Sequence, residues 1–411
     1  MNSRSEFEAL DAQDELAPWR DAFELPEGVI YLDGNSLGPL PKAVVQRVQQ
    51  VVQEEWGREL IRSWNTADWL HLPQRVGARI ARLIGAEPDE VIAADSTSVN
   101  LFKVLAAALE MCPGRTEVVS ESGNFPTDLY IAEGVVHHAS GERVLRLVSS
   151  DQVLEALSSN TAVLLLTHVD YRSGQMHAMQ EVTQRAHEVG ALVIWDLSHS
   201  AGAMPVDLNA CGADFAIGCG YKYLNGGPGA PAFLFVARRH QEAARQPLSG
   251  WLGHAQPFAF ESGYTPAPGV DRFLCGTPGV LGMSALETAL EVFESVDLQV
   301  VRSKSLLLSQ HFMELVESRC TGFGLELSTP REARLRGSQV SFAHPEAFAV
   351  MRALIAQGVI GDFRAPNLMR FGFTPLYTRF TDVWDAVEAL REILQERRWD
   401  SPEFQQRTAV T

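Results

Sequence analysis

Leu192-Val193-Ile194-Trp195-Asp196-Leu197-Ser198-His199 is an apolar run that ends in an acid and a histidine. The next apolar run along the chain, Phe215–Cys219, ends shortly before Lys222 and a glycine-rich stretch. Both runs are typical of strands in an open α/β sheet, where ligands bind beyond the carboxyl ends of the strands. We therefore expect Asp196, His199 and Lys222 to converge on one crevice.

The surrounding sequence continues this alternation of strands and helices. Five further apolar runs predict strands at Val91–Ala94, Glu117–Ser120, Val144–Val148, Ala162–Val169 and Ala232–Val236. Amphipathic segments between them predict helices at Val99–Glu110, Thr127–His137, Gln152–Ser158 and Met179–Val189. Near-continuous apolar runs without alternation indicate strands buried on both faces. The predicted fold class is α/β, with a large, mostly parallel central sheet flanked by helices.

The two ends of the chain have a different pattern. Residues 41–84 are predicted to be largely helical, and Ser284–Arg319 has a long helical pattern that is broken near Ser295–Asp297. Short strands and a closing helix are predicted after it, at Gly324–Ser328, Gln339–Phe342, Met369–Phe373 and Thr381–Arg397, before a frayed tail at Arg407–Thr411. We predict a large α/β domain at 61–280 and a small α+β domain formed by residues 1–60 and 281–411.

Composition excludes several classes of protein. The 411 residues include 34 Lys and Arg against 51 Asp and Glu, a formal charge of −17, which disfavours binding to nucleic acids or anionic membranes. Apolar stretches such as Ala162–Leu166 are far too short to span a bilayer, and Met1–Ala22 lacks the apolar core of a signal peptide. The five scattered cysteines form no CxxC pair, so neither a disulfide framework nor a metal site is expected. A cytoplasmic enzyme is predicted.

The acid and the lysine at the predicted crevice suggest pyridoxal 5'-phosphate (PLP) as the cofactor. PLP needs a lysine amine in a partly desolvated pocket for its aldehyde, and a carboxylate that keeps its ring nitrogen protonated. Taken singly, Lys222 is typical of a loop residue before Gly-Gly, and Asp196 of a helix cap. Their combination with Tyr221 and His199 favours the cofactor site, whereas Cys219 is interpreted as a small buried apolar residue.

Two other turns supply candidates for holding the phosphate and the ring. Thr97 and Ser98 follow the strand Val91–Ala94 and open a helix, whose N-terminus is a ready anion site, although the pattern alone also fits an ordinary N-cap. Phe125-Pro126-Thr127-Asp128 follows another strand, so that Phe125 is placed to stack on the ring and Asp128 adds a second acid. A core aromatic is the alternative for Phe125.

Together the motifs resemble those of a known family. The lysine block Tyr221–Gly229 is similar to that of fold type I PLP enzymes, the aspartate aminotransferase superfamily. Within that superfamily the chain closely resembles the kynureninase family. The matching motifs are Leu32-Asp33-Gly34-Asn35-Ser36-Leu37-Gly38, Ser98–Leu101, Phe125–Asp128, Asp196–His199, Gly250-Trp251-Leu252-Gly253-His254 and Arg370-Phe371-Gly372-Phe373-Thr374-Pro375-Leu376-Tyr377.

The resemblance implies a role for each matching residue. Lys222 carries the cofactor covalently, Asp196 pairs with the ring nitrogen, and Tyr221 lines the cofactor. Because Tyr221 is next to Lys222 in the sequence, we also take its phenol as the candidate catalytic proton donor. The other residues implied to surround the cofactor are Thr97, Ser98, Phe125, Pro126, Thr127, Asp128, Thr167 and His199. Trp251 and Thr277 are implied to reach the cofactor phosphate of a second subunit, which makes the active unit a homodimer. Asn35, Ser36 and Arg370 are implied to bind the substrate, with Arg370 holding its α-carboxylate.

The implied reaction is hydrolysis of the Cβ–Cγ bond of L-kynurenine, and of its 3-hydroxy form, to an anthranilate and L-alanine in tryptophan catabolism and NAD biosynthesis. Among alternatives, a cysteine desulfurase or selenocysteine lyase needs a mobile cysteine shortly before the arginine, but Cys320 lies far upstream of Arg370. An aminotransferase shares the core residues and stays open. A metal-dependent hydrolase built on Asp196, His199 and His254 lacks HExxH or HxH spacing. A non-catalytic binding module leaves the combined lysine, acid and arginine unexplained.

Overall fold

The computed structural model describes residues 3–138 and 142–406, which form two compact units. The large unit comprises Ala43–Asp170 and His177–Glu291, and the small unit comprises Met1–Lys42, Tyr171–Met176 and Val292–Thr411. The predicted tail Arg407–Thr411 lies outside the described residues. No helix in the described part of the chain is long and apolar enough to cross a membrane.

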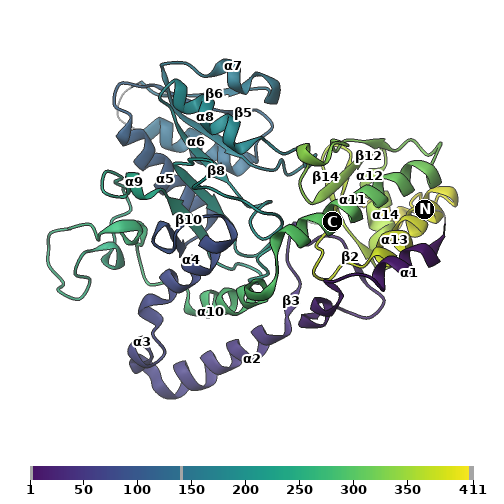
Figure 1. Cartoon of the computed structure of the whole chain (residues 1–411), viewed down its shortest axis with the longest axis horizontal. Coiled ribbons are helices and arrows are strands. Elements are labelled where there is room, and N and C mark those ends of the chain that lie inside the picture. Colours follow the sequence, from purple (N-terminus) through teal and green to yellow (C-terminus); the bar gives the residue numbers. More distant parts are fainter. Residues whose placement is uncertain (1–2, 139–141, 407–411) are drawn as a thin grey trace. The chain divides into compact units, whose positions relative to one another are not determined.

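A seven-stranded sheet forms the centre of the large unit (Figure 1). Its spatial order is β4-β10-β9-β8-β7-β5-β6, and every neighbouring pair is parallel except those that involve β10. The strands are β4 Val91–Ala94, β5 Glu117–Glu121, β6 Val144–Val148, β7 Thr161–Thr167, β8 Leu192–Asp196, β9 Phe215–Gly218 and β10 Ala232–Val236. The predicted α/β class with a mostly parallel sheet is therefore confirmed.

Several strand bounds differ from those predicted, and one prediction of burial is wrong. Strand β7 runs from Thr161 to Thr167 rather than from Ala162 to Val169, since the chain bends at His168, just after the last residue that pairs with β8. Strand β5 continues to Glu121, and β9 ends at Gly218. Strand β6 is not buried on both faces, since it forms the edge of the sheet and most of its residues are exposed or half-buried. The remaining strands have fully or almost fully buried patterns, as their apolar runs predict.

Helices cover both faces of this sheet. Ile194 points to the face packed by α5, whereas its neighbour Trp195 points to the other face and donates a hydrogen bond to Thr183 of α8 (3.1 Å). The helices that lie wholly or mainly in the large unit are α2 Lys42–Gln50, α3 Ser63–Thr66, α4 Leu72–Leu83, α5 Thr97–Met111, α6 Pro126–His138, α7 Val153–Ala156, α8 Met179–Glu188, α9 Arg238–Gln241 and α10 Val280–Ala289. Apart from the edge strand β6, the strands of the sheet are thus buried between helices.

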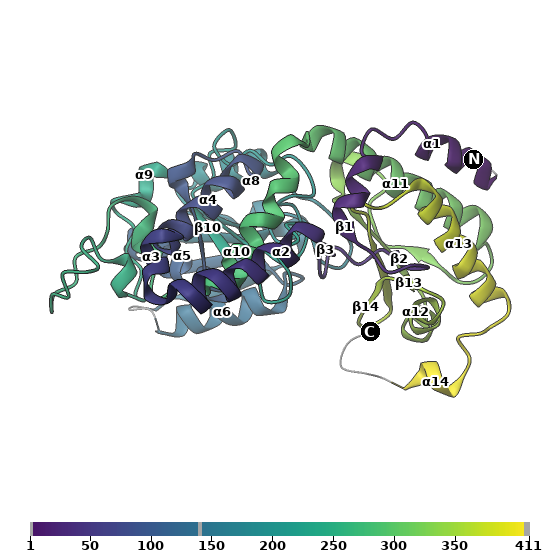
Figure 2. The same cartoon turned by 90° about the horizontal axis from the view of Figure 1, so that it is seen from below.

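The small unit is an α+β module around an antiparallel sheet of order β11-β12-β15-β14. Helices α11 and α13 run side by side over it (Figure 2) and share one apolar core with α1, α12 and the sheet. Its strands and helices are β1 Phe23–Glu24, β2 Ile30–Tyr31, β3 Leu40–Pro41, β11 Glu326–Leu327, β12 Gln339–Ala343, β13 Val359–Ile360, β14 Asp362–Arg364, β15 Leu368–Gly372, α1 Arg4–Asp11, α11 Leu298–Arg319, α12 Ala347–Ala356, α13 Phe380–Gln395 and α14 Pro402–Gln405. Sequence patterns did not predict α12, β13 or β14.

The unit boundaries differ from those predicted at residues 60/61 and 280/281. Residues from Ala43 onward belong to the large unit because Val44 packs against Ala285 and Ala289 of α10. The small unit also takes in Tyr171–Met176, whose backbone carbonyls accept hydrogen bonds from side chains of β12, for example Gln339 to Tyr171 (3.0 Å). A segment of only six residues that joins the other unit in this way has no distinctive composition by which the sequence could reveal it.

Candidate active site

Four segments that follow strands of the large unit's sheet lie at the same end of that sheet. Because β10 is antiparallel to both β4 and β9, strand β4 points the same way as β7, β8 and β9. The carboxyl ends of these strands carry the turn Asp95–Ser98, Thr167, Asp196 and the Lys222 loop. The predicted convergence of Asp196, His199 and Lys222 follows from this strand arrangement.

Lys222 lies between a histidine and an aromatic ring. Its Nζ is 3.0 Å from Nε2 of His199 and 5.9 Å from the centre of the Phe125 ring. The loop that carries it is tightly folded, since Asn225 adopts a left-handed φ of 57° and a Cβ on Gly226 would lie 2.7 Å from the carbonyl oxygen of Gly220. Glycine is required where backbones approach so closely. The loop thus fixes the amine at the strand ends.

Asp196 and Asp128 form a buried pair of acids. The backbone N–H of Ser198 donates to Oδ1 of Asp196 (2.7 Å). Burial first, and then the neighbouring Asp196, raise the pKa of Asp128 well above its usual value. The two side chains are hydrogen-bonded to each other, and Oδ2 of Asp128 has no hydrogen-bond partner within the described structure. The raised pKa favours the protonated form of Asp128.

Thr167 belongs to a series of hydrogen-bonded polar side chains, of which the sequence analysis named only Thr167. Its hydroxyl donates to Oδ1 of Asn124, and the amide of Asn124 donates to Ser120 on β5 (3.1 Å). Asn124 Oδ1 also accepts from the N–H of Phe125 (2.7 Å). Asn124 consequently fixes both Thr167 and the start of α6, and its place just before Phe125-Pro126 was the available signal.

The turn from β4 to α5 forms the candidate phosphate cradle. Ser96 caps the helix by accepting from the N–H of Val99 (3.3 Å), so that half-buried Thr97 and Ser98 form its first turn. First-turn N–H groups have no partner within a helix and attract anions. Pro126 and Thr127 similarly open α6, where both are half-buried.

Tyr221 is protonated at neutral pH. Burial, followed by nearby negative charge at Cys219 and Asp196, raises the pKa of its phenol to about 12. Cys219 itself is buried, and burial raises the pKa of its thiol, which fits the predicted apolar role. Tyr221 can therefore act as a proton donor but not as a base.

Trp251 and Thr277 lie on outer loops of the large unit. The Trp251 ring packs edge-on against Trp64 and Phe258, with ring centres 6.4 and 5.6 Å away, while Thr277 is exposed. Phe258 and Phe260 on the same loop are 57% and 81% exposed. His254 is engaged within this loop, because its Nδ1 accepts from the N–H of Gln256 (2.9 Å). That engagement disfavours the alternative metal site with Asp196 and His199.

The small unit places Arg370 in a cluster of its own. Its Nε donates to Asp362 (2.8 Å) in a two-point ion pair, its Nη2 donates to Ser36 (2.7 Å), and its Nη1 donates to the carbonyl of Tyr171. The side-chain oxygen of Asn35, oriented toward Arg370, lies 2.9 Å from Nε. Asn35, Ser36 and Arg370 are thus brought together as predicted, and Asp362 is an unpredicted member.

A further acid, Asp33, completes this cluster. Burial and the negative charge of Asp362 raise the pKa of Asp33 to about 8, although Arg370 opposes the rise. For Asp362, burial is outweighed by Arg370 and Arg364, which lower its pKa to about 2. At neutral pH Asp362 is therefore ionised, whereas Asp33 is mainly protonated.

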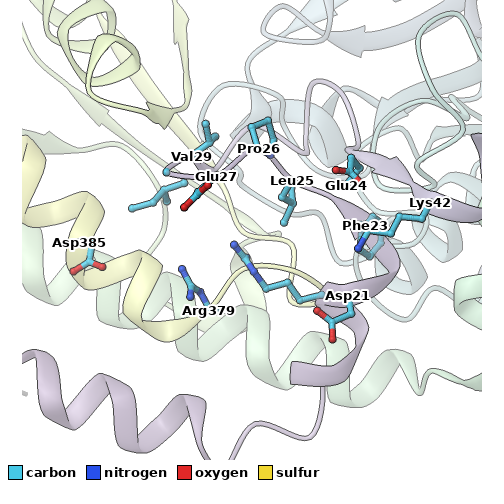
Figure 3. A pocket seen from close by; sticks show the side chains of 13 residues that line it. Asp21, Phe23, Glu24, Leu25, Pro26, Glu27, Val29, Lys42, Arg379 and Asp385 are labelled. Carbon is cyan, nitrogen blue, oxygen red and sulfur yellow. The ribbon is translucent and has the colours of Figure 1, made fainter.

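The small unit also has an open groove of about 460 Å³ that is separate from this cluster (Figure 3). It is lined mainly by residues 20–30 together with Lys42, Arg379 and Asp385. Its two arginines are already engaged, since Arg20 and Arg379 both bind Asp382. None of the predicted site residues lines it, so it is not the catalytic site.

The large unit's groups fit PLP. An amine beside an aromatic face matches the aldehyde and ring, and the buried acid Asp196 at the end of β8 matches the ring nitrogen. The free first turn of α5 matches the phosphate. In this arrangement Lys222, Asp196 and the Thr97–Ser98 turn hold three different parts of the cofactor.

Comparisons with known proteins identify the family. The chain is 57% identical to a kynureninase from Burkholderia mallei (strain SAVP1) and 55% identical to one from Pseudomonas fluorescens, each over 416 aligned residues and the full length of both proteins. The chain belongs to the kynureninase family. Residues 301–390 match the family model described as the kynureninase C-terminal domain.

Solved structures show that this chain shares its fold with enzymes of sulfur chemistry. An apo cysteine desulfurase from Thermococcus onnurineus NA1 superposes with a TM-score of 0.77 at 20% identity, covering 92% of this chain and 98% of that one. The cystine C-S lyase C-DES superposes with a TM-score of 0.78 at 15% identity, covering 89% and 98%. At these identities the likeness establishes the fold type I architecture alone.

Proposed function

We propose that this protein is a PLP-dependent hydrolase that cleaves the Cβ–Cγ bond of L-kynurenine to give anthranilate and L-alanine. The observation that carries the proposal is the arrangement of Lys222, His199 and the Asp196–Asp128 pair at the strand ends of a kynureninase-family chain. Bound PLP supplies an electron sink for the negative charge that develops on the substrate carbons. The protein's own residues must then hold the cofactor and move protons.

Lys222 is the covalent anchor and the base. Its amine would hold the cofactor through the aldehyde group, and Nζ would take the proton from the substrate Cα. His199, 3.0 Å away, orients this amine. Asp196 would pair with the ring nitrogen, and the raised pKa of Asp128 disfavours a second negative charge beside it.

Tyr221 completes the carbon–carbon cleavage. Water adds to the carbonyl carbon Cγ, the Cβ–Cγ bond breaks with its electron pair moving to Cβ, and the Tyr221 phenol gives Cβ a proton. A phenol with a pKa of about 12 keeps its proton until this step. Arg370 binds the substrate α-carboxylate through its guanidinium, with Asn35 and Ser36 on the substrate side.

Cysteine-based chemistry is disfavoured by the position of Cys320. It lies at the end of α11 with 3% of its surface exposed, within the core of the small unit. Burial and the charge of Glu388 raise the pKa of its thiol to about 12. A buried, protonated thiol is a poor nucleophile, so the fold shared with desulfurases does not extend to their reaction.

The proposed active unit is a cytoplasmic homodimer in which Trp251 and Thr277 contact the cofactor phosphate of the partner. The exposure of Phe258 and Phe260 on the Trp251 loop supports an apolar contact with a second copy. Light scattering of the purified protein tests this, and a monomer with full activity would contradict it.

Incubation of the purified protein with PLP and L-kynurenine tests the reaction directly. Anthranilate fluorescence should rise with time, and alanine should accumulate in equal amount. A parallel assay with 3-hydroxy-L-kynurenine measures the preference between the two substrates. A protein that binds PLP but forms no anthranilate compound would refute the proposed reaction.

A further inference from the structure

Lys103 is a buried cation outside the groups considered so far. It lies in the middle of α5, and none of its surface is exposed. Lysines are almost never fully buried unless paired, since desolvating an ammonium costs several kcal/mol. Its retention in the core therefore depends on the partners that it holds.

The two partners of Lys103 lie in different segments of the large unit. Its Nζ donates to Oδ2 of Asp95 at 2.5 Å and to the carbonyl of Phe273 at 2.6 Å. Asp95 is the first residue of the turn that leads to Thr97 and Ser98. The ammonium therefore reaches back along α5 to the base of the candidate phosphate cradle.

Asp95 needs such an anchor. Its φ of 45° is in the left-handed region, which is unfavourable for most residues with a Cβ, although Asp adopts it more readily than most. The same turn is pinned by the N–H of Ala232, which donates to the carbonyl of Asp95 (2.9 Å), and by Asn100, which donates to the carbonyl of Ala94 (2.8 Å). Lys103 supplies the only ionic contact made by the Asp95 side chain within the described residues. It thus helps to set the direction of the first turn of α5.

Phe273 connects Lys103 to the second group of predicted phosphate contacts. It precedes Leu274 and Cys275, and the carbonyl of Cys275 accepts from the N–H of Leu252 (3.2 Å). A Cβ on Gly250 would lie 2.3 Å from that same carbonyl oxygen, so the two segments are packed backbone to backbone. The segments that carry Trp251 and Thr277 are therefore packed together, and Lys103 links them through Phe273 to the Asp95 turn. We call these two segments, 250–252 and 273–277, the platform.

We propose that Lys103 is a positioning residue for the cofactor phosphate. Through Asp95 it fixes the turn that presents Thr97 and Ser98, and through Phe273 it ties that turn to the platform of Trp251 and Thr277. This inference rests on the proposed PLP site. It predicts that loss of the ammonium weakens binding of the phosphate group in particular, rather than binding of the pyridine ring.

The chain contains a matched control in Lys304 of the small unit. Its Nζ donates to Asp14 at 2.6 Å and to the carbonyl of Pro375 at 2.6 Å, and the residue is 6% exposed. It has the same kind of partners as Lys103, one carboxylate and one carbonyl, but belongs to the unit without the cofactor groups. Lys103→Met and Lys304→Met each remove a buried ion pair of the same construction.

The test measures cofactor affinity, by absorbance titration of the cofactor-free protein with PLP and with pyridoxal, which lacks the phosphate. In Lys103→Met the dissociation constant for PLP should rise about tenfold or more. This is the typical effect of removing a residue that positions the groups in contact with a ligand. Its dissociation constant for pyridoxal should change less than about twofold, because only the phosphate cradle is affected. Lys304→Met should leave the PLP constant within about twofold of the parent protein, whatever it does to thermal stability.

Each other outcome has a definite meaning. An unchanged PLP constant in a folded Lys103→Met protein overturns the proposal, and so does equal weakening by Lys304→Met or equal loss of PLP and pyridoxal affinity. If Lys103→Met does not fold, Asp95→Asn replaces it, and an unchanged PLP constant in that variant likewise overturns the proposal. A parent protein that binds no PLP at all refutes the proposed function instead.

Discussion

The two polar clusters of this protein differ in what surrounds their cationic side chain. In the large unit, Lys222 lies 3.0 Å from Nε2 of His199 and 5.9 Å from the centre of the Phe125 ring, and no ion pair joins it to a carboxylate within the described residues. In the small unit, Arg370 is bound at once by Asp362, Ser36 and Tyr171. The lysine is therefore open to a group that the chain does not supply, whereas the arginine is held in place by its own neighbours.

This difference indicates a division of roles. A lysine that no carboxylate holds in an ion pair is available for covalent attachment, which suits a cofactor that stays bound. An arginine that its neighbours already hold loses little conformational entropy when it binds a carboxylate. Because its donors are already engaged, it also binds that carboxylate weakly, which suits a substrate whose product must leave. Substitutions in the two clusters should therefore have distinct signatures.

The largest effect is expected for Lys222→Ala. Loss of the covalent anchor and the base should lower turnover by about 10⁴-fold or more, measured as anthranilate fluorescence. The visible absorbance of the imine formed with PLP should disappear as well. The exposed Lys42 is the control, and Lys42→Ala should keep both activity and spectrum. A Lys222→Ala protein with the parent's spectrum would contradict the assignment.

A large effect on substrate binding is expected for Arg370→Lys. A lysine keeps the charge but loses the two-point geometry, so KM should rise by about 100-fold while the PLP dissociation constant stays unchanged. Arg336, another buried arginine of the small unit, is the matched control. If Arg336→Lys raises KM equally, Arg370 has no special role in binding the substrate.

The two acids of the large unit should respond unequally. Asp196→Asn removes the charge that pairs with the ring nitrogen and should weaken PLP binding or turnover by about 100-fold or more. Asp128→Asn replaces a carboxyl whose raised pKa favours its protonated form, so a change within about fivefold is expected. Equal losses in the two variants would contradict this difference between the two acids.

The smallest effect concerns pH and Asp33. Its pKa is raised to about 8 by burial and by Asp362, so between pH 4 and 8 the folded protein holds a proton that the unfolded chain has lost. Folded stability therefore falls as pH rises through this window. Asp33→Asn should remove that part of the fall, so urea unfolding at pH 5 and pH 8 should show a smaller difference for the variant. An identical pH dependence would exclude a neutral Asp33.

Much of the large unit was predictable because its signals are local. Apolar runs such as Leu192–Asp196 and Ala232–Val236 form strands with the predicted bounds, since a strand buried on both faces must be apolar throughout. The small unit was predicted less completely. Strand Asp362–Arg364 carries two charged residues in three, because its polar side chains face Arg370 and Ser36 rather than solvent. Such a strand has no apolar pattern from which it could be found.

The sequence by itself determined the chemistry at the strand ends. An acid at the end of one strand and a lysine shortly after the next parallel strand lie at the same end of the sheet, so the proximity of Asp196 and Lys222 could be predicted without coordinates. Only the tertiary structure decided which groups hold these residues in place. Asp362 on Arg370, Asn124 on Thr167 and Lys103 on Asp95 are contacts between segments or across turns, and each depends on distances that packing sets and residue order does not.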